Sequence, residues 1–311
     1  MRPTKQVWRD ALATNGEFFL GLDGGATRCR ARLRDASGAA LAERAGPAAN
    51  IYVNFDGAIG VVRSLVAGAA EESGLSPSAF GRIALGLGLA GLQSNIDAER
   101  VVASLGGFAS VRADNDAVVA CLGAHAGADG AIVIAGTGSA GMAMVAGKRT
   151  LIGGRGFLIG DDGSAARIGT DAVRAAVLAH DGLGPASQLT ESLMKRFSDD
   201  ANEAARWAAT AKPRDYGELA PLVFAAAEHG DGVANTIVAN AARAIAALAQ
   251  ALQGVGARRI ALLGGVGEAI RRHLPIAIDA ALSRPLYDAT DGAILLAGGV
   301  LPAHGHTSAS S

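Results

Sequence analysis

The chain has 311 residues, 50% of them hydrophobic, and a formal net charge of -1. This length favours two domains over one, and the composition is sufficient for a large buried core. A nearly neutral net charge gives no excess of basic residues to bind nucleic acid or an anionic membrane, so we expect neither as a partner. We expect a small-molecule substrate instead. The stretch from Met1 to Asp10 lacks the apolar run of a secretion signal, which favours a cytoplasmic protein.

Two cysteines, Cys29 and Cys121, are too few for a disulfide framework, and the six histidines are scattered without metal-ligand spacing. We interpret both thiols as small core residues. A long stretch without a charged residue, 131–147, is interrupted by glycines. We expect a buried pair of strands there rather than a membrane span.

The first half of the chain alternates strands with helices. It follows a polar stretch, residues 1–16, that has no periodicity and is expected to be a loose extension. Apolar residues such as Ile59, Val62 and Val66 repeat with helical spacing. The expected elements are strands at 18–22, 29–33 and 40–45, a helix over 56–73, a strand at 82–89, a helix over 97–105 and a strand at 109–113. This order favours a mixed sheet.

The second half begins with a short helix and then repeats the opening hairpin. A long helical region in its middle shows clear 3.6-residue periodicity, for example at Ile237, Ala241 and Ile245. The expected elements are a helix over 117–125, strands at 132–135 and 142–145, helices within 164–254, a strand at 259–263 and a last helix over 291–301. Residues 304–311 are expected to be a second loose tail. The repeated hairpin predicts a two-lobed α/β protein.

Two glycine-rich turns share one pattern: Gly21-Leu22-Asp23-Gly24-Gly25-Ala26-Thr27 and Ala135-Gly136-Thr137-Gly138-Ser139. Glycine lets the backbone approach a phosphate group, and the neighbouring Thr and Ser add hydroxyl and N–H donors. Neither turn has the spacing of a P-loop or of the dinucleotide fingerprint. A single turn of this kind is as consistent with ordinary hairpin chemistry as with binding. Two of them predict a duplicated clamp for nucleotide phosphates.

These motifs resemble those of the BadF-type ATPases, which lie within the sugar kinase, actin and heat-shock ATPase superfamily and include N-acetylglucosamine kinase and bacterial glucosamine kinase. The two turns are similar to the first and second phosphate motifs, and 261–266 is similar to the adenosine motif. The segment 153–164 resembles the Gly-Gly-Trp-Gly stretch of the family, which ends in Gly-Asp-Glu-Gly-Ser. The resemblance extends from about Phe18 to Leu301.

This resemblance implies a two-lobed actin-like ATPase fold, in which two duplicated ribonuclease H-like domains flank a cleft. The expected N-terminal lobe comprises residues 17–116 and 291–303. The expected C-terminal lobe comprises residues 117–290 and includes a helical insertion. The implied cofactors are ATP and Mg²⁺, with Asp23 as the metal ligand, although a turn residue bonded to its own backbone is an alternative for Asp23. The residues expected to bind the nucleotide are Gly24, Gly25, Thr27, Gly136, Thr137, Gly138, Ser139, Gly264 and Gly265.

Asp116 is the candidate catalytic residue. It lies between a predicted strand and a predicted helix, and it matches the catalytic aspartate in the Asp-Ala pair of the family. Phosphoryl transfer to a sugar hydroxyl needs a carboxylate that positions the hydroxyl and accepts its proton. The alternative for Asp116 is a helix N-cap, a position that aspartate favours. Asp114 is the rival carboxylate.

The resemblance also implies sugar contacts from Asn50, Asp116 and Asp161, with Arg155 as a further candidate. A carboxylate such as Asp161 accepts two hydroxyl protons in fixed geometry. Asp162 is interpreted as the cap of the helix that runs to His180. Asn50 has ordinary turn chemistry as its alternative. Arg155 stands where the eukaryotic N-acetylglucosamine kinases carry tryptophan, so both glucosamine and N-acetylglucosamine stay open as substrates.

The glycine run Gly86 to Gly91 has two interpretations, close approach to the substrate or close packing of a strand against a helix. The expected function is an ATP- and Mg²⁺-dependent kinase that phosphorylates the 6-hydroxyl of an amino sugar, with a homodimer left open. One alternative is an ATPase that activates a partner enzyme, which the absence of a cysteine cluster disfavours. The other is a non-catalytic binding module, although a regulator usually adds a DNA-binding segment, for which the N-terminus is too short.

Overall fold

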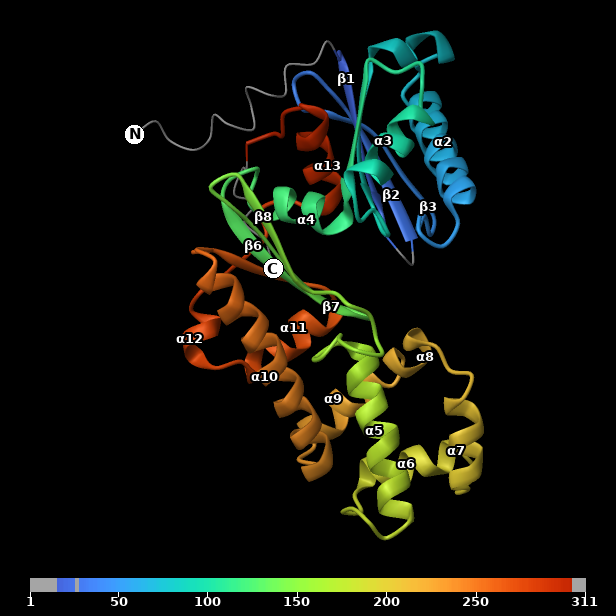
Figure 1. The fold of residues 1–311 in the computed structure, drawn as a ribbon, viewed down its shortest axis with the longest axis vertical. Helices are drawn as coiled ribbons and strands as arrows, with labels where there is room; N and C mark the ends of the chain where they lie inside the picture. Colours follow the sequence, from blue (N-terminus) through green and yellow to red (C-terminus); the bar gives the residue numbers. More distant parts are fainter. Residues whose placement is uncertain (1–15, 26–27, 304–311) are drawn as a thin grey trace, which may run out of the picture. The chain divides into compact units, whose positions relative to one another are not determined.

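The computed structural model describes residues 16–25 and 28–303, so Thr27 and the tails 1–15 and 304–311 lie outside the described residues. The chain forms two compact units (Figure 1). Unit 1 runs to Gly130 and adds Met144–Lys148 and the chain from Arg284 onward, and unit 2 comprises Ala131–Ala143 and Arg149–Ser283. The sequence suggested boundaries after residues 116 and 290. In the structure the first boundary lies later, after Gly130, and the second lies earlier, before Arg284. The reason is that α4 (Asp116–Ala124) packs against α13 (Ala289–Ala297) inside unit 1.

Unit 1 is built on a five-stranded sheet with the order β3-β2-β1-β4-β5. β1 is antiparallel to β2 and parallel to β4, and β5 continues the parallel direction. Its strands are β1 (Phe18–Gly24), β2 (Arg28–Asp35), β3 (Ala40–Pro47), β4 (Ile83–Leu89) and β5 (Ser110–Asn115). The remaining elements are α2 (Phe55–Glu72), η1 (Pro77–Arg82) and α3 (Asn95–Ala103), together with α4 and α13.

Leucine side chains fill one face of this sheet. The helix α2 packs over that face (Figure 1). Leu20, Leu22, Leu85 and Leu87 are fully buried there. The inward stripe of α2 predicted from periodicity is buried as well, so the helix contributes a continuous apolar face to the core. Asn54 caps α2 by accepting a hydrogen bond from the Gly57 N–H.

The helices α13 and α4 cross the opposite face (Figure 1). The strands carry glycines at the points of contact. A Cβ on Gly21 would lie 2.2 Å from the Thr290 carbonyl oxygen, and one on Gly86 would lie 1.9 Å from the Ala293 carbonyl oxygen. A Cβ on Gly88 would lie 2.0 Å from a methyl group of Val119. At Gly21 and Gly86 the backbone of α13 therefore rests directly on the sheet, and at Gly88 the Val119 side chain of α4 fills the space. For Gly86 and Gly88, the structure therefore supports the packing interpretation of the glycine run.

Unit 2 repeats this plan with a sheet in the order β10-β9-β6-β7-β8. β6 is parallel to β9, and β9 is parallel to β10. Its strands are β6 (Gly130–Ala135), β7 (Ser139–Val145), β8 (Lys148–Gly153), β9 (Ile260–Leu263) and β10 (Leu282–Ser283). Its helices are α5 (Ala165–His180), α6 (Gln188–Arg196), α7 (Ala201–Ala208), α8 (Pro213–Gly217), α9 (Ala220–Glu228), α10 (Gly232–Gly254), α11 (Gly265–Ile270), η2 (Arg271–His273) and α12 (Ile276–Asp279).

The two strand orders match when unit 2 is read from β8, because in each sheet three consecutive strands are followed by two that return after helices. This confirms the duplicated two-unit α/β fold. The predicted strand pair in the charge-free stretch is also confirmed, as β6 and β7. The sequence pattern did not predict β8 or the short β10. Cys29 and Cys121 are buried, and burial raises the pKa of Cys29 to about 11 and that of Cys121 to about 12, so both behave as core thiols.

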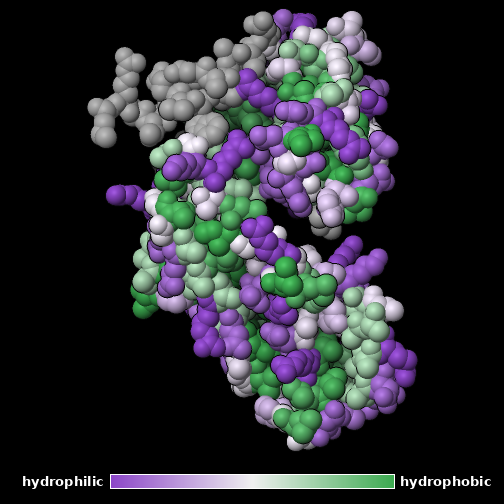
Figure 2. All heavy atoms as spheres, in the orientation of Figure 1, coloured by the Kyte–Doolittle hydropathy of each residue, from purple (hydrophilic) through white to green (hydrophobic). Residues whose placement is uncertain are grey.

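Within the described residues, α10 is the one helix long and apolar enough to cross a membrane by length and composition. Its apolar stripe, which includes Ile237, Ala241 and Ile245, is buried within unit 2, where α10 packs against α5 and α9. In the view of Figure 2, hydrophilic residues interrupt the hydrophobic ones over the part of unit 2 where Figure 1 places α10. These features are those of a core helix.

Candidate functional site

The candidate residues of unit 1 gather at the carboxyl edge of its parallel strands. Asp23 lies near the end of β1, and Asp116 begins α4 directly after β5. The register aligns Asp23 with Gly88 of β4 and Gly88 with Asp114 of β5. Because the ends of parallel strands meet at one edge, residues far apart in the chain come together there.

The Asp23 carboxylate is partly buried and lies between charges of both signs. Its Oδ2 is 3.7 Å from an Arg30 guanidinium nitrogen, and another nitrogen of Arg30 is 3.5 Å from Asp288. Burial raises the pKa of Asp23, the charge of Arg30 opposes this shift, and the charges of Asp116 and Asp288 add to it. Asp23 and Asp116 therefore lie close enough to repel each other, which is the electrostatic setting that a cation relieves.

Asp116 does not cap α4. Asn115 occupies the cap position, and its Oδ1 accepts a hydrogen bond from the Ala117 N–H at 2.9 Å. The Asp116 carboxylate accepts from the same N–H, also at 2.9 Å. Burial raises the pKa of Asp116, and this hydrogen bond opposes the shift. The Asp114 carboxylate bonds the Asn115 N–H within its own strand.

Three arginines on β2, Arg30, Arg32 and Arg34, form an arginine ladder that was not among the residues expected from the sequence. Arg34 donates two hydrogen bonds to Asp291, at 2.8 and 3.1 Å, and both residues are buried. Arg32 lies 2.8 Å from Asp291 and 3.1 Å from Asp288, the N-cap residue of α13. The ladder therefore fastens α13 beside Asp23. Its signal in the sequence is the strand-period spacing of the arginines, since alternate residues of a strand share one face.

Asn50 lies beside the end of β4, where it forms an isolated parallel bridge with Ala90. Its Oδ1 accepts hydrogen bonds from the Tyr52 and Val53 N–H groups at 3.0 and 3.2 Å, which is turn chemistry. A Cβ on Gly91 would lie 2.4 Å from that oxygen. The loop after β4 is also bonded to the start of α4, because the Asn115 side chain donates to the Leu92 carbonyl at 2.9 Å. The loop after β4 therefore contacts both the Asn50 segment and the start of α4, where Asp116 lies.

Most of the other residues expected to bind the nucleotide lie in the two glycine turns. In unit 1, Gly24 accepts a hydrogen bond from the Ala90 N–H at 2.8 Å, and the Gly25 N–H donates to Arg28 at 3.1 Å. In unit 2, the turn 136–139 joins β6 to β7, and the Gly136 N–H donates to Gly138 at 3.0 Å. The N–H groups of Thr137 and Gly138 make no hydrogen bond to a described residue, so they are available to an anion.

Asp161 packs against the unit 2 turn. Its Oδ1 accepts a hydrogen bond from the Ser139 N–H at 3.2 Å, and a Cβ on Gly138 would lie 2.9 Å from its Oδ2. Asp162 was expected to cap α5, and this was wrong. Ser164 is the cap, because its hydroxyl accepts from the Arg167 N–H and it stands directly before the first helical residue.

The outer part of the 153–164 segment is open to solvent. Arg155 is exposed and makes no ion pair with a described residue. Leu158 and Ile159 are 90% and 81% exposed, which is unusual for two consecutive large apolar side chains. The structure therefore brings Asp161, Gly138 and Ser139 together and leaves Arg155 apart from them.

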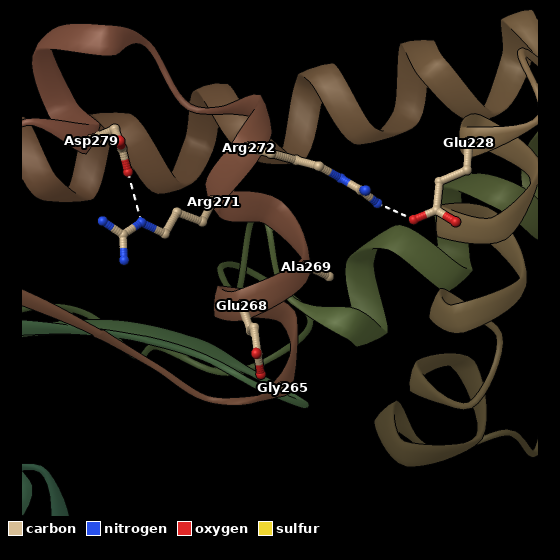
Figure 3. Close-up of a pocket in the computed structure, with 7 residues that line it drawn as sticks. All are labelled: Glu228, Gly265, Glu268, Ala269, Arg271, Arg272 and Asp279. Atoms are coloured by element: carbon tan, nitrogen blue, oxygen red, sulfur yellow. Dashed lines mark hydrogen bonds and ion pairs between the residues drawn. The ribbon is translucent and has the colours of Figure 1, made fainter. Parts of the chain in front are cut away.

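Gly264 directly follows β9, and the next residue, Gly265, lines a pocket. Gly264 has a φ of 94°, and a Cβ there would lie 2.4 Å from the Ala135 carbonyl oxygen, immediately before the glycine turn. The pocket has a volume of about 650 Å³, within the range of small-ligand sites. Figure 3 shows the residues that line it, which are Glu228, Gly265, Glu268, Ala269, Arg271, Arg272 and Asp279.

Both arginines of this pocket are paired. Arg271 donates to Asp279 at 2.7 Å, and Arg272 bonds Glu228, as the dashed lines of Figure 3 show. Their charges are therefore neutralised, and the pocket suits an uncharged group better than a phosphate. The Thr137 and Gly138 N–H groups lie in the turn that follows the neighbouring strand β6. A nucleoside in the pocket and its phosphates at the turn would thus lie along one edge of the sheet.

Two five-stranded sheets of matching order define the actin-like ATPase fold, and a glycine turn follows the first strand of the sheet in each unit. The profile of the BadF/BadG/BcrA/BcrD ATPase family matches residues 20–297, and the chain belongs to this family.

Named relatives cover nearly the whole chain. A glucosamine kinase of Vibrio cholerae is 38% identical over 281 residues, which is 90% of this chain and 96% of the relative. The structure of a candidate N-acetylglucosamine kinase from Chromobacterium violaceum covers 91% of this chain and 99% of its own, with a TM-score of 0.83 and 33% identity. A glucokinase of the ROK family from Streptomyces griseus shares the fold, with a TM-score of 0.51, 18% identity and coverage of 91% of this chain and 98% of its own.

Proposed function

We propose that the chain is an ATP-dependent amino-sugar kinase that phosphorylates the 6-hydroxyl of glucosamine or N-acetylglucosamine. The observation that carries the proposal is the edge of unit 2, where the turn 136–139, Asp161 and the pocket at Gly265 adjoin. The 38% identity to a glucosamine kinase over 90% of the chain supports the substrate class. Both cysteines are buried, which leaves the partner-activating alternative without a cluster ligand at the surface.

Asp116 is the proposed general base. Its carboxylate hydrogen-bonds the sugar hydroxyl and accepts its proton as the hydroxyl oxygen attacks the transferred phosphoryl group. Asn50 and Asp161 orient the sugar by hydrogen bonds to its other hydroxyls. The Thr137 and Gly138 N–H groups bind phosphate oxygens and stabilise the charge that develops on them.

Asp23 is the proposed contact for Mg²⁺. No group of three or more His, Cys, Asp or Glu side chains is placed to hold a metal within the described ranges 16–25 and 28–303. Magnesium is commonly bound through one or two carboxylates, with waters and substrate phosphates completing its octahedron. The repulsion between Asp23 and Asp116 fits that arrangement, because a cation would lower it. When bound, Mg²⁺ spreads the charge of the phosphates.

Release of ADP tests the proposed function. The protein with Mg-ATP is given glucosamine, N-acetylglucosamine, glucose or no sugar in separate reactions. We expect ADP release to depend strongly on one amino sugar, and that sugar is then the substrate. Hydrolysis at the same rate without sugar would instead support the activator, and no ADP in any reaction would support a binding module.

Replacing Asp23 with asparagine is expected to raise the Mg²⁺ concentration needed for half-maximal turnover by about tenfold or more, because one carboxylate ligand loses its charge. A magnesium titration of the initial rate measures this. Asp56→Asn, at an exposed position in the first turn of α2, is the control with the same change in net charge. Equal magnesium dependence in the wild type and both variants would remove Asp23 from the metal site.

A further inference from the structure

The Asp161 carboxylate occupies the inner side of the turn that the proposed function assigns to phosphate. An added Cβ on Gly138 would lie 2.9 Å from Oδ2, 3.1 Å from Cγ and 3.1 Å from Oδ1, so the whole carboxylate lies flat against this glycine. The Ser139 N–H, one of the donors of the turn, is already bonded to Oδ1 at 3.2 Å. An equivalent Cβ on Gly136 would meet no atom within 4 Å. The crowding in this turn is therefore specific to Asp161.

The negative charge of Asp161 is not cancelled by an adjacent cation. No described Arg, Lys or His lies within ion-pair distance of it, and the Arg167 guanidinium instead donates to the Phe157 and Gly160 carbonyls and lies 3.4 Å from Asp162. Burial raises the pKa of Asp161, while the Ser139 N–H and the more distant charge of Arg167 oppose this shift. An anionic phosphate that approached the Thr137 and Gly138 N–H groups would meet a like charge that no adjacent cation neutralises.

The backbone around Asp161 is fixed, whereas its side chain has a single described hydrogen bond. Asp161 has a φ of 63°, a conformation that costs energy for a residue with a Cβ. Hydrogen bonds from the Ser164 N–H to the Asp161 carbonyl, at 3.0 Å, and from the Ser139 hydroxyl to the Asp162 carbonyl, at 2.8 Å, hold the main chain in place. Rotation of the side chain alone would therefore free the Ser139 N–H.

We propose that Asp161 is a positioning residue that screens the phosphate-binding turn 136–139 until sugar binds, and that sugar hydroxyls release the turn by drawing the carboxylate onto themselves. This rests on the proposed function, in which Asp161 accepts hydrogen bonds from the sugar. The Asp161 carboxylate then accepts hydrogen bonds from sugar hydroxyls instead of from the Ser139 N–H. Asp161 stays hydrogen-bonded, and the Ser139 N–H becomes available to a phosphate oxygen. Sugar and nucleotide then increase each other's affinity, as linkage requires. Without sugar, when water is the only possible acceptor of the phosphoryl group, the protein binds ATP less tightly.

The test is the affinity for the ATP analogue AMPPNP with Mg²⁺, measured by calorimetry with and without glucosamine, so that no turnover is needed. Asp161→Asn removes the charge and keeps an acceptor for the Ser139 N–H, and asparagine tolerates a positive φ. Asp161→Gly removes the side chain and also permits that φ. Asp162→Asn is the matched control, since its side chain is 72% exposed and its carboxylate lies 3.4 Å from the Arg167 guanidinium. Thermal unfolding checks that each variant is folded.

We expect both Asp161 variants to bind AMPPNP about tenfold or more tightly than the wild type without sugar, because a like charge beside the phosphates is gone. We expect Asp162→Asn to match the wild type. Glucosamine should tighten AMPPNP binding to the wild type by about fivefold or more and leave Asp161→Gly unchanged. Wild-type affinity in the Asp161 variants without sugar overturns the inference, even if glucosamine is phosphorylated. The proposed function is tested by a different experiment: it is wrong if no amino sugar supports ADP release.

Discussion

Replacing Asp116 with asparagine is expected to lower the turnover number about 10²–10⁴-fold, the usual contribution of a general base. The nucleotide and the sugar should still bind with dissociation constants within about threefold of wild type, because asparagine keeps the shape and one acceptor oxygen. Asn115, rather than Asp116, caps α4, so the substitution leaves the helix start in place. Steady-state kinetics and calorimetric binding measure the two effects separately.

The pH dependence gives a second test of Asp116. Burial raises the pKa of this carboxyl, so the base form is lost at a higher pH than for an exposed aspartate. In the wild type, kcat/KM should therefore fall as the pH is lowered through that raised pKa. In Asp116→Asn the contribution of Asp116 to this acid limb should be absent, which leaves only that of Asp23 and Asp161, whose pKa values burial also raises. Asp114→Asn is the control carboxylate and should retain turnover within about tenfold. Normal turnover in Asp116→Asn, or a collapse confined to Asp114→Asn, would contradict the assignment.

The second large effect is on stability. Gly86→Ala is expected to destabilise the protein by about 3 kcal/mol or more, because overpacked positions lose this much when the neighbours cannot move. The new methyl group would lie 1.9 Å from the Ala293 carbonyl oxygen, which belongs to the backbone of α13. That helix is held by the buried Arg34 and Asp291 pair, so it cannot simply withdraw. A fall in the thermal unfolding temperature, or an insoluble product, is the expected result.

Gly60→Ala is the control for the same substitution in open space. Gly60 lies inside α2, and a Cβ there meets no atom within 4 Å. Alanine should raise stability by roughly 0.8–1 kcal/mol, the difference in helix propensity. An unfolding temperature of Gly86→Ala equal to that of the wild type would show that α13 does not rest on β4 as described.

Local patterns were sufficient to predict most of the elements. The apolar spacing of Ile59, Val62 and Val66 gave α2, and the repeated glycine turn gave the duplicated sheets, because both signals lie within a few residues of the element that they define. The strands β8 and β10 were missed. The first is a partly exposed strand, and the second has two residues that belong to the sheet only through pairing with β9.

Only those features of the candidate site that lie within one short motif could be predicted from the sequence. The strand end before Asp116 indicated its position, yet the sequence could not show that Asn115 caps the helix, since both residue types favour that place. The arginine ladder was missed because its partners, Asp288 and Asp291, come from the far end of the chain. The contact of Asp161 with Gly138 depends on a positive φ that no local pattern encodes.

Identification of the phosphorylated product tests the central proposal most directly. The protein is incubated with Mg-ATP and each amino sugar, and the products are examined by mass spectrometry and by phosphorus–proton correlation NMR. The account predicts a hexosamine monophosphate with its phosphate on the 6-oxygen, formed in equal amount to ADP. Formation of ADP without a sugar phosphate, or a phosphate attached to a different oxygen, would contradict it.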